Sequence, residues 1–350
     1  MSRRVALVCP GRGTYTKSEL GFFSKALPAR AAAETERRLA HADAVRAARG
    51  DASLRELDGA AAFGARHLAG ENAGALIYAC TATDALRIDP AKAEVVAVCG
   101  NSMGWYTALH VAGALDFEAG FTLADGMGAM QKDGVIGGQL ITPVVDDAWR
   151  PDPARRAEVE AALADVAAAG AAVGWSIRLG GFAVLWGDAD GVKRLLAALP
   201  KRKLGEREYP FQLQGHSAFH SPLLEGVSAK ARARFGELPW RAPAVPLIDG
   251  RGRQHRPLTA DPRALLDYTV GEQIVATYDF TASIRVVLRD YAPDRLVLLG
   301  PGDTLGGAIA QTFVEEGWQG LRSKADFAAR QKEDPILVAM ARDEQAALVS

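Results

Sequence analysis

Apolar and polar residues alternate along the chain in blocks that predict a series of strands and helices. Short apolar runs over Val5–Cys9 and Val95–Cys99 are typical of buried strands. Residues 28–70 are rich in alanine, arginine and glutamate, a composition that favours helices. Gly74–Cys80 is strand-like, although its pattern is ambiguous. Strands that alternate with helices indicate an α/β protein with a mostly parallel sheet that is covered on both faces.

The composition changes near residue 134, where a second group of elements begins. Gly180-Gly181 separates two apolar runs in the manner of a hairpin turn. The predicted order is strand, helix, strand, strand, helix and strand, over residues 137–145, 153–169, 174–178, 182–186, 188–199 and 208–213. This order fits a small ferredoxin-like α+β insert. We therefore expect a large α/β-hydrolase-like domain from residues 1–133 and 210–350, and a small subdomain from residues 134–209.

The last part of the chain predicts two further elements. Leu296–Leu299 runs into Gly300-Pro301-Gly302 and indicates a late strand followed by a turn. Residues 321–350 are highly charged and predict a surface helix. These elements would complete the large domain.

The overall composition is that of a soluble globular protein. Hydrophobic residues make up 49% and charged residues 24%, the usual balance for this class. The net charge of −1 argues against nucleic-acid binding, and no apolar stretch approaches the ~20 residues of a membrane span. The first apolar run is too short for a signal peptide. Cys9, Cys80 and Cys99 stand far apart and predict free, buried thiols in a reducing cytoplasm.

The strand over Val95–Cys99 ends in Gly100-Asn101-Ser102-Met103-Gly104 and passes directly into a helix-compatible segment. Gly-x-Ser-x-Gly between a strand and a helix is the pattern of a nucleophile elbow, a sharp turn that exposes the serine hydroxyl. The free N–H groups and the positive dipole end of the following helix would point at the reacting centre. An ordinary strand–helix turn is the competing interpretation, but the context favours Ser102 as a nucleophile.

A nucleophilic serine needs a base, and the chain offers six histidines. His41 and His67 lie in surface-type helices, and His255 lies in a basic loop. His110 would lie about 12 Å along the helix from Ser102 at 1.5 Å per residue, too far to pair with it. His216 and His220 remain. Their spacing could indicate a metal pair, yet no acidic or cysteine partner stands nearby. Spacing alone gives His220 only a small advantage as the base.

Several segments together resemble the malonyl-CoA:acyl carrier protein transacylase family, which includes the acyltransferase domains of fatty acid and polyketide synthases. They stand in the family's order at Pro10–Gly13, Gly100–Gly104, Ala112–Phe117, Ser217–Leu223 and Gly300–Gly302. The similarity extends over residues 5–315. It implies a Ser102–His220 dyad, in which the histidine deprotonates first the serine and then the thiol of a carrier protein's phosphopantetheine.

The resemblance also implies the groups around this dyad. In the family a main-chain carbonyl orients the histidine, and matching Thr281–Ser283 assigns it to Asp279 and not to the nearest glutamine, Gln273. The backbone N–H groups of Arg12 and Met103 would form the oxyanion hole. Such donors contribute roughly 3–4 kcal/mol each to transition-state stabilisation.

The chain departs from the family's usual residues around the acyl pocket. Arg12 stands where the family usually has glutamine, and Asn101 and Trp105 replace a histidine and a glutamate beside the serine. The arginine that normally pairs with the malonate carboxylate aligns with Met127, which cannot form that ion pair. We therefore expect an atypical member that lacks the malonate-binding arginine and takes an uncharged acyl group. Arg12 would be the one replacement cation.

The phenylalanine directly before His220, Phe219, resembles the residue at this position in family members that accept malonyl. In those members the phenylalanine narrows the space beside the α-carbon of the acyl group, which favours a linear acyl group. The predicted acyl pocket therefore contains Asn101, Trp105, Met127 and Phe219. The basic cluster Lys201-Arg202-Lys203 is a solvated loop or a contact for an acidic carrier protein.

Together these points predict a cytoplasmic acyltransferase of fatty acid or polyketide biosynthesis. It would move an acyl group from acyl-CoA or acyl carrier protein through Ser102 to a carrier protein. Acyl-CoA and phosphopantetheine would be substrates, with no resident cofactor, no metal, no nucleic acid and no membrane as a partner. The alternatives are a hydrolase that clears carrier-protein thioesters, malonyl transfer with Arg12 as the cation, and a non-catalytic subunit that binds a carrier protein.

Overall fold

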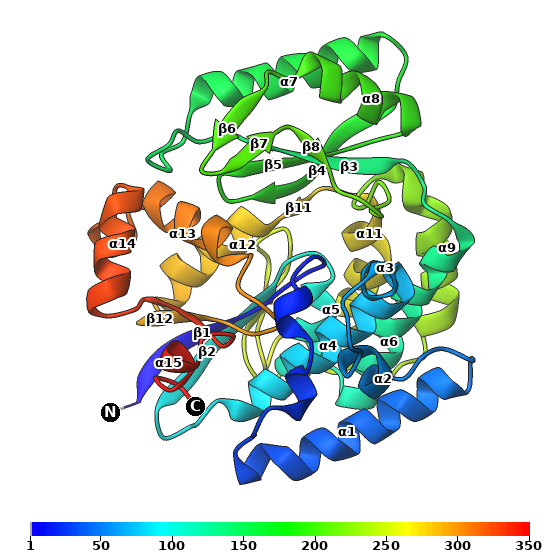
Figure 1. The fold of residues 1–350 in the computed structure, drawn as a ribbon, viewed down its shortest axis with the longest axis vertical. Coiled ribbons are helices and arrows are strands. Elements are labelled where there is room, and N and C mark those ends of the chain that lie inside the picture. Colours follow the sequence, from blue (N-terminus) through cyan, green and yellow to red (C-terminus); the bar gives the residue numbers. More distant parts are fainter. Residues whose placement is uncertain (1) are drawn as a thin grey trace.

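The computed structural model of the protein describes residues 2–350, which fold around two large β-sheets (Figure 1). The larger sheet has six strands in the order β10-β9-β2-β1-β12-β13. Neighbouring strands run parallel except for the edge pair β10–β9. The strands are β1 (Arg3–Cys9), β2 (Ala93–Gly100), β9 (Leu247–Ile248), β10 (Gln254–His255), β12 (Arg295–Leu298) and β13 (Leu337–Ala339). The predicted α/β class with a mostly parallel sheet is confirmed.

Helices from the first third of the chain pack beside β1 and β2. α5 contacts both strands, and α4 packs against α1, α5 and α6. These helices are α1 (Ala29–Ala47), α2 (Leu54–Asp58), α3 (Ala65–Leu68), α4 (Gly70–Arg87), α5 (Gly104–Val111) and α6 (Phe117–Ala129). The later helices are α9 (Glu225–Phe235), α10 (Pro262–Asp267), α11 (Gln273–Val275), α12 (Phe280–Val286), α13 (Gly306–Glu315), α14 (Lys324–Glu333) and α15 (Asp343–Ala346). No helix within residues 2–350 is long and apolar enough to cross a membrane.

The smaller sheet has the strand order β11-β4-β5-β3-β8. Its elements are β3 (Gly138–Pro143), α7 (Pro153–Ala168), β4 (Val173–Leu179), β5 (Phe182–Gly187), α8 (Ala189–Ala198) and β8 (Phe211–Gln212). They follow the predicted ferredoxin-like order, and α7 and α8 cover the face that points away from the larger sheet (Figure 1). A short hairpin, β6 (Arg202–Leu204) and β7 (Arg207–Tyr209), precedes β8.

The smaller sheet reaches beyond residues 134–209, the range that we predicted for the subdomain. β8 ends at Gln212, and β11 (Tyr278–Asp279) adds parallel to β4 from a part of the chain much later in the sequence. The division into two domains stays an interpretation. What the topology establishes is that residues 278–279 connect the second half of the chain to the smaller sheet.

One expectation about the elements was wrong and a second was incomplete. Gly74–Cys80 is not a strand but part of the helix α4. The pattern was misleading because every residue from Ala73 to Asp84 is buried, and a helix buried on all sides has no polar face to reveal its period. Residues 321–350 contain the charged helix α14, but also β13, which forms the edge of the larger sheet. β13 is only three residues long, too short to give a periodic signal.

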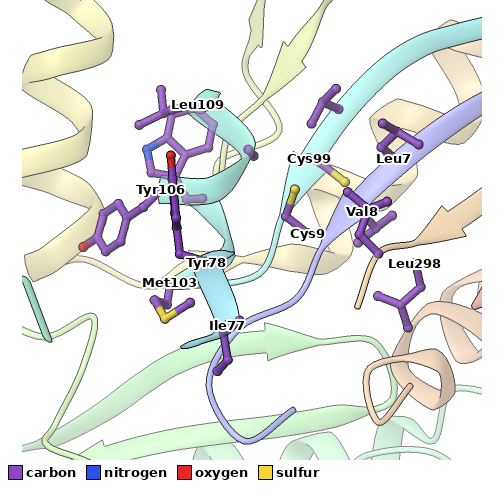
Figure 2. Close-up of a cluster of buried hydrophobic side chains, with 14 of the residues drawn as sticks. Leu7, Val8, Cys9, Ile77, Tyr78, Cys99, Met103, Tyr106, Leu109 and Leu298 are labelled. Atoms are coloured by element: carbon purple, nitrogen blue, oxygen red, sulfur yellow. The ribbon is translucent and has the colours of Figure 1, made fainter. Parts of the chain in front are cut away.

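The buried core holds the carboxyl ends of β1 and β2 in place (Figure 2). Leu7, Val8 and Cys9 of β1 lie beside Cys99 of β2, and all four are buried. The three cysteines are free and buried, as predicted. Burial raises the pKa of Cys99 to about 12, so the thiol stays protonated and behaves as an apolar group. The end of β2 is therefore a rigid base for the turn that follows it.

Candidate active site

Ser102 lies on a sharp turn between β2 and α5, and its backbone φ is +54°. A non-glycine residue with this φ is strained, as in a nucleophile elbow. The flanking glycines make the turn possible. A Cβ on Gly100 would lie 2.3 Å from the Gly104 carbonyl oxygen, and a Cβ on Gly104 would lie 2.2 Å from the Cys9 carbonyl oxygen. The Gly-x-Ser-x-Gly pattern is therefore a steric requirement of this turn.

His220 completes a hydrogen-bonded pair with Ser102. Its Nε2 lies 2.7 Å from Ser102 Oγ, and its Nδ1 lies 2.6 Å from the main-chain carbonyl oxygen of Gln273. Because a carbonyl can only accept, Nδ1 carries the proton and Nε2 accepts the serine hydroxyl. His220 also has a positive φ of 57°. Both members of the pair are thus held in strained backbone, which proteins retain mainly at functional sites.

The His220 ring is buried and neutral. Desolvation lowers the pKa of His220 to about 4, although the hydrogen bond to the Gln273 carbonyl opposes this shift. At neutral pH the unprotonated Nε2 is available to accept a proton from Ser102. The arrangement is that of a nucleophile and its general base.

The expectation that Asp279 orients the histidine was wrong. The Asp279 side chain caps α12 by accepting from the Ala282 N–H at 2.7 Å, and the Asp279 N–H donates to the Gly250 carbonyl at 2.6 Å. Gln273 instead begins α11, directly after a π-helical turn over Tyr268–Glu272. Counting back from Gly300 fails because the segment between Gln273 and that glycine contains another π-helical turn, Val287–Tyr291, and is longer than the count assumed. The glutamine itself was the signal that would have identified the position.

The Gln273 side chain makes further contacts that could not be predicted from the sequence. Its Nε2 donates to the Ser102 carbonyl at 3.2 Å, and its Oε1 accepts from the Tyr106 hydroxyl at 3.0 Å. The Tyr278 hydroxyl donates to the Gly100 carbonyl at 2.6 Å. Gln273, Tyr106 and Tyr278 therefore support the strained turn through hydrogen bonds to and around its main chain.

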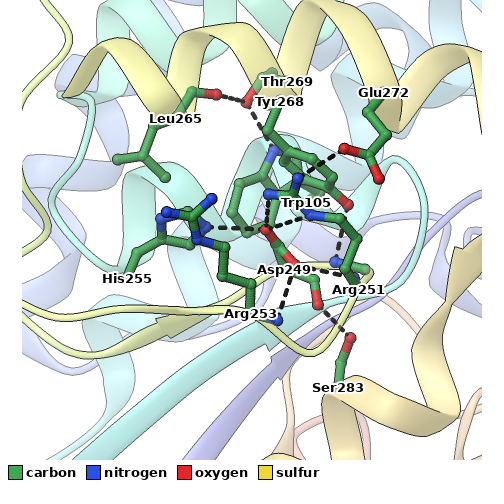
Figure 3. Close-up of polar contacts among 11 residues, drawn as sticks. Trp105, Asp249, Arg251, Arg253, His255, Leu265, Tyr268, Thr269, Glu272 and Ser283 are labelled. Carbon is green, nitrogen blue, oxygen red and sulfur yellow. Dashed lines mark hydrogen bonds and ion pairs between the residues drawn. The ribbon is translucent and has the colours of Figure 1, made fainter. Parts of the chain in front are cut away.

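Trp105 does not lie in the pocket, contrary to our expectation. Its side chain is fully buried behind the turn, where its ring packs edge-on against Tyr268 with 5.2 Å between centroids. Its Nε1 donates to Thr269 Oγ1 at 2.9 Å. Figure 3 shows this contact beside a cluster in which Asp249 accepts hydrogen bonds from Arg251 and His255. Trp105 therefore connects α5 to the π-helical turn before Gln273.

Asn101 does not line the cavity either. It is buried against Gly11, where a Cβ would lie 2.6 Å from the Asn101 carbonyl oxygen. In both corrections the sharp turn separates a sequence neighbour of Ser102 from the cavity, whereas Met103, directly after the serine, does line it. Met127 and Phe219, the other two predicted pocket residues, do line the cavity.

The cavity beside Ser102 and His220 encloses about 970 Å³, including its open mouth. We call its buried apolar part the floor and its exposed part the rim. The floor consists of the buried Gly74, Met103, Tyr106 and Ala124 together with the half-buried Met127. The rim consists of the exposed Asp133, Ile136 and Lys230 together with the half-buried Arg12 and Gln131. Tyr106 and Ala124 are 6% and 1% exposed, whereas Ile136 is 43% exposed. The charged side chains therefore gather at the open end.

Arg12 is the charged residue of the cavity that is best placed to bind an anionic group. Its guanidinium donates to Gln131 Oε1 at 2.5 Å and to the Leu68 carbonyl at 3.1 Å, and it lies 5.5 Å from the centre of the Phe219 ring. Desolvation lowers the pKa of Arg12 to about 10, with Glu71 opposing the shift. The side chain is still a cation at neutral pH, and both of its hydrogen-bond acceptors are neutral.

His216 takes no part in this pair. Its Nδ1 lies 2.8 Å from Gln139 Oε1, and desolvation lowers its pKa to about 3. No cluster of three His, Cys, Asp or Glu side chains that could hold a metal ion occurs within residues 2–350. The spacing of His216 and His220 thus corresponds to no metal site in the part of the chain that the structure describes.

Comparison with known proteins places this geometry in a known fold. No model of a known protein family and no curated protein matches the sequence. The structure is similar to a malonyl-CoA:acyl carrier protein transacylase from Xanthomonas oryzae, with a TM-score of 0.73 and 21% identity over 99% of this chain and 98% of that one. It is equally similar to an acyl-carrier-protein S-malonyltransferase from Burkholderia pseudomallei, with a TM-score of 0.73 and 20% identity over 99% of both chains.

A third similar structure is a malonyl-transacylase in complex with its type II polyketide synthase acyl-carrier protein. The TM-score is 0.72 and the identity 18%, over 99% of this chain and 98% of that one. At such identities the similarity establishes the fold and leaves the substrate open. The chain has the acyltransferase fold of these transacylases over its whole length.

Proposed function

We propose that the protein is an acyltransferase that carries an acyl group on Ser102 to the phosphopantetheine thiol of an acyl carrier protein. The observation that carries the proposal is the 2.7 Å contact between Ser102 Oγ and His220 Nε2 at the wall of a largely apolar cavity. The transacylase fold supports the same class of reaction. Acyl-CoA or acyl carrier protein is the donor, and the proposal includes no resident cofactor.

Each half-reaction moves one proton through His220. As Ser102 Oγ attacks the thioester carbonyl, Nε2 accepts the hydroxyl proton. The C–S bond then breaks, the departing thiolate takes this proton, and an ester on Ser102 remains. In the second half, the carrier thiol gives its proton to Nε2, its sulfur attacks the ester, and Ser102 regains the proton. The Gln273 carbonyl keeps the ring in one tautomer throughout.

The backbone N–H groups of Arg12 and Met103 are the proposed oxyanion hole. Both residues line the cavity together with Ser102. Met103 directly precedes α5, where the first N–H groups of a helix have no acceptor within it. Because these donors belong to the backbone, the unusual side chain of Arg12 leaves the arrangement intact.

The proposed acyl group is uncharged and linear. Met127 lines the floor and cannot pair with a carboxylate, so a malonyl carboxylate buried there would cost several kcal/mol. Phe219 lines the same cavity beside His220 and narrows it for branched groups. A malonyl group is the second candidate, because the Arg12 guanidinium lines the cavity and has only neutral acceptors.

An acyl carrier protein is the proposed partner. The complex of a similar transacylase with its carrier protein supports this choice. The basic cluster Lys201–Lys203 is one proposed contact for an acidic carrier, although Arg202 already pairs with Glu158. Fatty acid and polyketide synthesis are the two pathways that use such a partner in the resembled family.

The proposal is tested by following acylation of the intact protein by mass spectrometry. The protein is incubated with acetyl-, octanoyl- and malonyl-CoA, with and without a holo carrier protein. We expect an adduct that is absent in Ser102→Ala and that passes to the carrier. His220→Gln, which keeps a hydrogen-bonding side chain without a base of suitable strength, is expected to slow acylation at least 100-fold, the lower end of the usual contribution of a general base.

Three results would contradict the proposal. An adduct that is lost to water, with no acyl-carrier product, would indicate a thioester hydrolase. No adduct from any donor would indicate a binding protein. Faster acylation by malonyl-CoA than by either uncharged donor would favour the second candidate, and loss of that preference in Arg12→Gln would identify its cation.

A further inference from the structure

Methionine is concentrated in the cavity beside Ser102. The chain has five methionines, and Met103, Met127 and Met130 all line this cavity. Methionine side chains are unbranched and flexible, so they adapt to apolar ligands of variable shape. Residues that only filled a core would not need to face an open cavity. The side chains indicate a surface that receives an apolar group.

The distribution of charge separates the two ends of this cavity. Lys230 and Asp133 form an ion pair at 3.1 Å with side chains 64% and 71% exposed, which marks the open rim. Met103 and Ala124 of the floor are 9% and 1% exposed. A polar group that enters from the rim can remain solvated, whereas any group that extends past Ser102 to the floor loses its water.

Two small residues keep the floor open between α4 and α6. A Cβ on Gly74 would lie 3.4 Å from the Ala124 carbonyl oxygen and 3.6 Å from Met103 Sδ. These are near-ordinary contacts, so a side chain here would fit and would fill space beside Met103. The backbones of α4 and α6 approach closely one turn away, where a Cβ on Gly128 would lie 2.7 Å from the Gly70 carbonyl oxygen.

From these observations we infer that the acyl substrates are linear saturated chains longer than butanoyl, whose alkyl ends occupy the floor. The inference rests on the proposed function of Ser102 and specifies its substrate class. The thioester carbonyl lies at Ser102, and the chain passes Met103 toward Gly74 and Ala124. An acetyl group would leave the floor empty and would gain nothing from it.

The size of the effect follows from the burial of methylene groups. Each buried CH₂ favours binding by an amount that corresponds to about a fourfold change in the equilibrium constant. The specificity constant for acylation of Ser102 should therefore rise up to about fourfold per methylene until the floor is full. Beyond that length it should fall, because overpacking a closed site costs free energy.

The test measures acylation of Ser102 by acetyl-, butanoyl-, hexanoyl-, octanoyl- and decanoyl-CoA, with malonyl-CoA as the charged donor. Gly74→Ala should slow acylation by octanoyl- and decanoyl-CoA more than by acetyl-CoA and so move the optimum to a shorter chain. Gly226→Ala is the matched control, since Gly226 is an exposed residue of α9 with no atom within 4 Å of an added Cβ. Met127→Ala should move the optimum to a longer chain.

A second measurement does not depend on turnover. Titration calorimetry with Ser102→Ala should show tighter binding of octanoyl-CoA than of acetyl-CoA, with a more negative heat-capacity change because apolar surface is buried. Equal affinities and equal acylation rates for all chain lengths would overturn the inference and leave the proposed function standing. No acyl-Ser102 from any donor would overturn the proposed function, and octanoyl binding to Ser102→Ala would then show the floor to be a binding site alone.

Discussion

The backbone carbonyl of Gln273 decides what His220 can do. By accepting from Nδ1 at 2.6 Å, it leaves Nε2 facing Ser102 Oγ and fixes one tautomer. Burial then removes the competing protonated form at neutral pH, since desolvation lowers the pKa of His220 to about 4. A buried histidine without an acidic partner is a weaker base than a solvated one. It is nevertheless ready to accept a proton over a wide pH range.

The pH dependence of acylation should report this shift. As the pH falls through the pKa of His220, Nε2 becomes protonated and can no longer accept the serine proton, so the rate is lost on the acid side. We expect kcat/KM for acyl-CoA to stay constant from neutral pH to about pH 5 and to fall to half near pH 4. Circular dichroism must show a folded protein across the range. A midpoint near the ordinary histidine value of about 6.5 would contradict a buried, neutral base.

Met127 offers a test of how charge selects the acyl group. Met127→Arg would place a guanidinium at the floor, where it can pair with a carboxylate in bidentate geometry. We expect malonyl-CoA to acylate Ser102 at least tenfold faster than in the unchanged protein, and octanoyl-CoA at least tenfold slower. Met127→Gln, which is similar in length and uncharged, should slow octanoyl transfer without admitting malonyl. Unchanged selectivity in Met127→Arg would place the specificity elsewhere in the cavity.

The residues of the pair were predictable, and the groups that hold them were not. Ser102 stands between glycines that the turn requires and so leaves a pattern in the sequence, whereas His220 was assigned by the resemblance of Ser217–Leu223 to the transacylase family. Gln273 acts through its carbonyl, a group common to every residue, and its place depends on a π-helical turn. Trp105 was wrongly predicted to line the pocket because it is close to Ser102 in sequence. In the structure its side chain is buried away from the cavity and bonds to Thr269.

At the scale of elements, α5 and the π-helical turn Tyr268–Glu272 form one unit behind the serine. The Trp105 indole donates to Thr269 Oγ1, and Thr269 Oγ1 donates in turn to the Leu265 carbonyl at 2.7 Å. Gln273 follows this turn directly. The helix that begins at the nucleophile therefore also sets the position of the carbonyl that orients the base.

Trp105→Phe should separate this positioning role from packing. The change keeps an aromatic ring against Tyr268 and removes the N–H donor to Thr269. We expect a stability loss of about 1 kcal/mol, the usual net value of one hydrogen bond, and a several-fold lower kcat with KM unchanged. Trp318→Phe is the matched control, because Trp318 packs on Phe313 away from the cavity. Equal effects on kcat in the two variants would assign Trp105 to packing alone.

Long, patterned elements were predicted well and short or fully buried ones were not. The hairpin β4–β5 and the helices α7 and α8 have clear period and turn residues, and the structure confirms them. α4 lost its helical period because its residues are buried on every side. β13 and β11 are set by neighbouring strands in space, which the local sequence does not record.

At the scale of the molecule, the two sheets supply different halves of the site. Ser102 follows β2 of the larger sheet, whereas the segment before His220 is fastened to the smaller one. Ser176 of β4 donates to the Phe219 carbonyl at 2.7 Å, and the Ala218 N–H donates to the Ile136 carbonyl at 2.7 Å. The distance between nucleophile and base thus depends on how the two sheets are placed relative to each other.

Ser176→Ala tests this dependence between the sheets. Ser176 is fully buried, so the variant leaves the Phe219 carbonyl without its donor, at a cost of about 1–3 kcal/mol in stability. We expect His220 to lose its fixed position and kcat to fall about tenfold with little change in KM, because the lost Phe219 contact controls the approach of base to nucleophile. The Gln139 amide, which donates to the same hydroxyl, loses its acceptor as well. Thr312→Val removes another fully buried hydroxyl, which donates to the Ala308 carbonyl within α13, and should lower the melting temperature without the loss in kcat. If Ser176→Ala lowers stability and leaves kcat intact, the contact between β4 and the Phe219 carbonyl does not position the base, and the Gln273 carbonyl alone would account for its orientation.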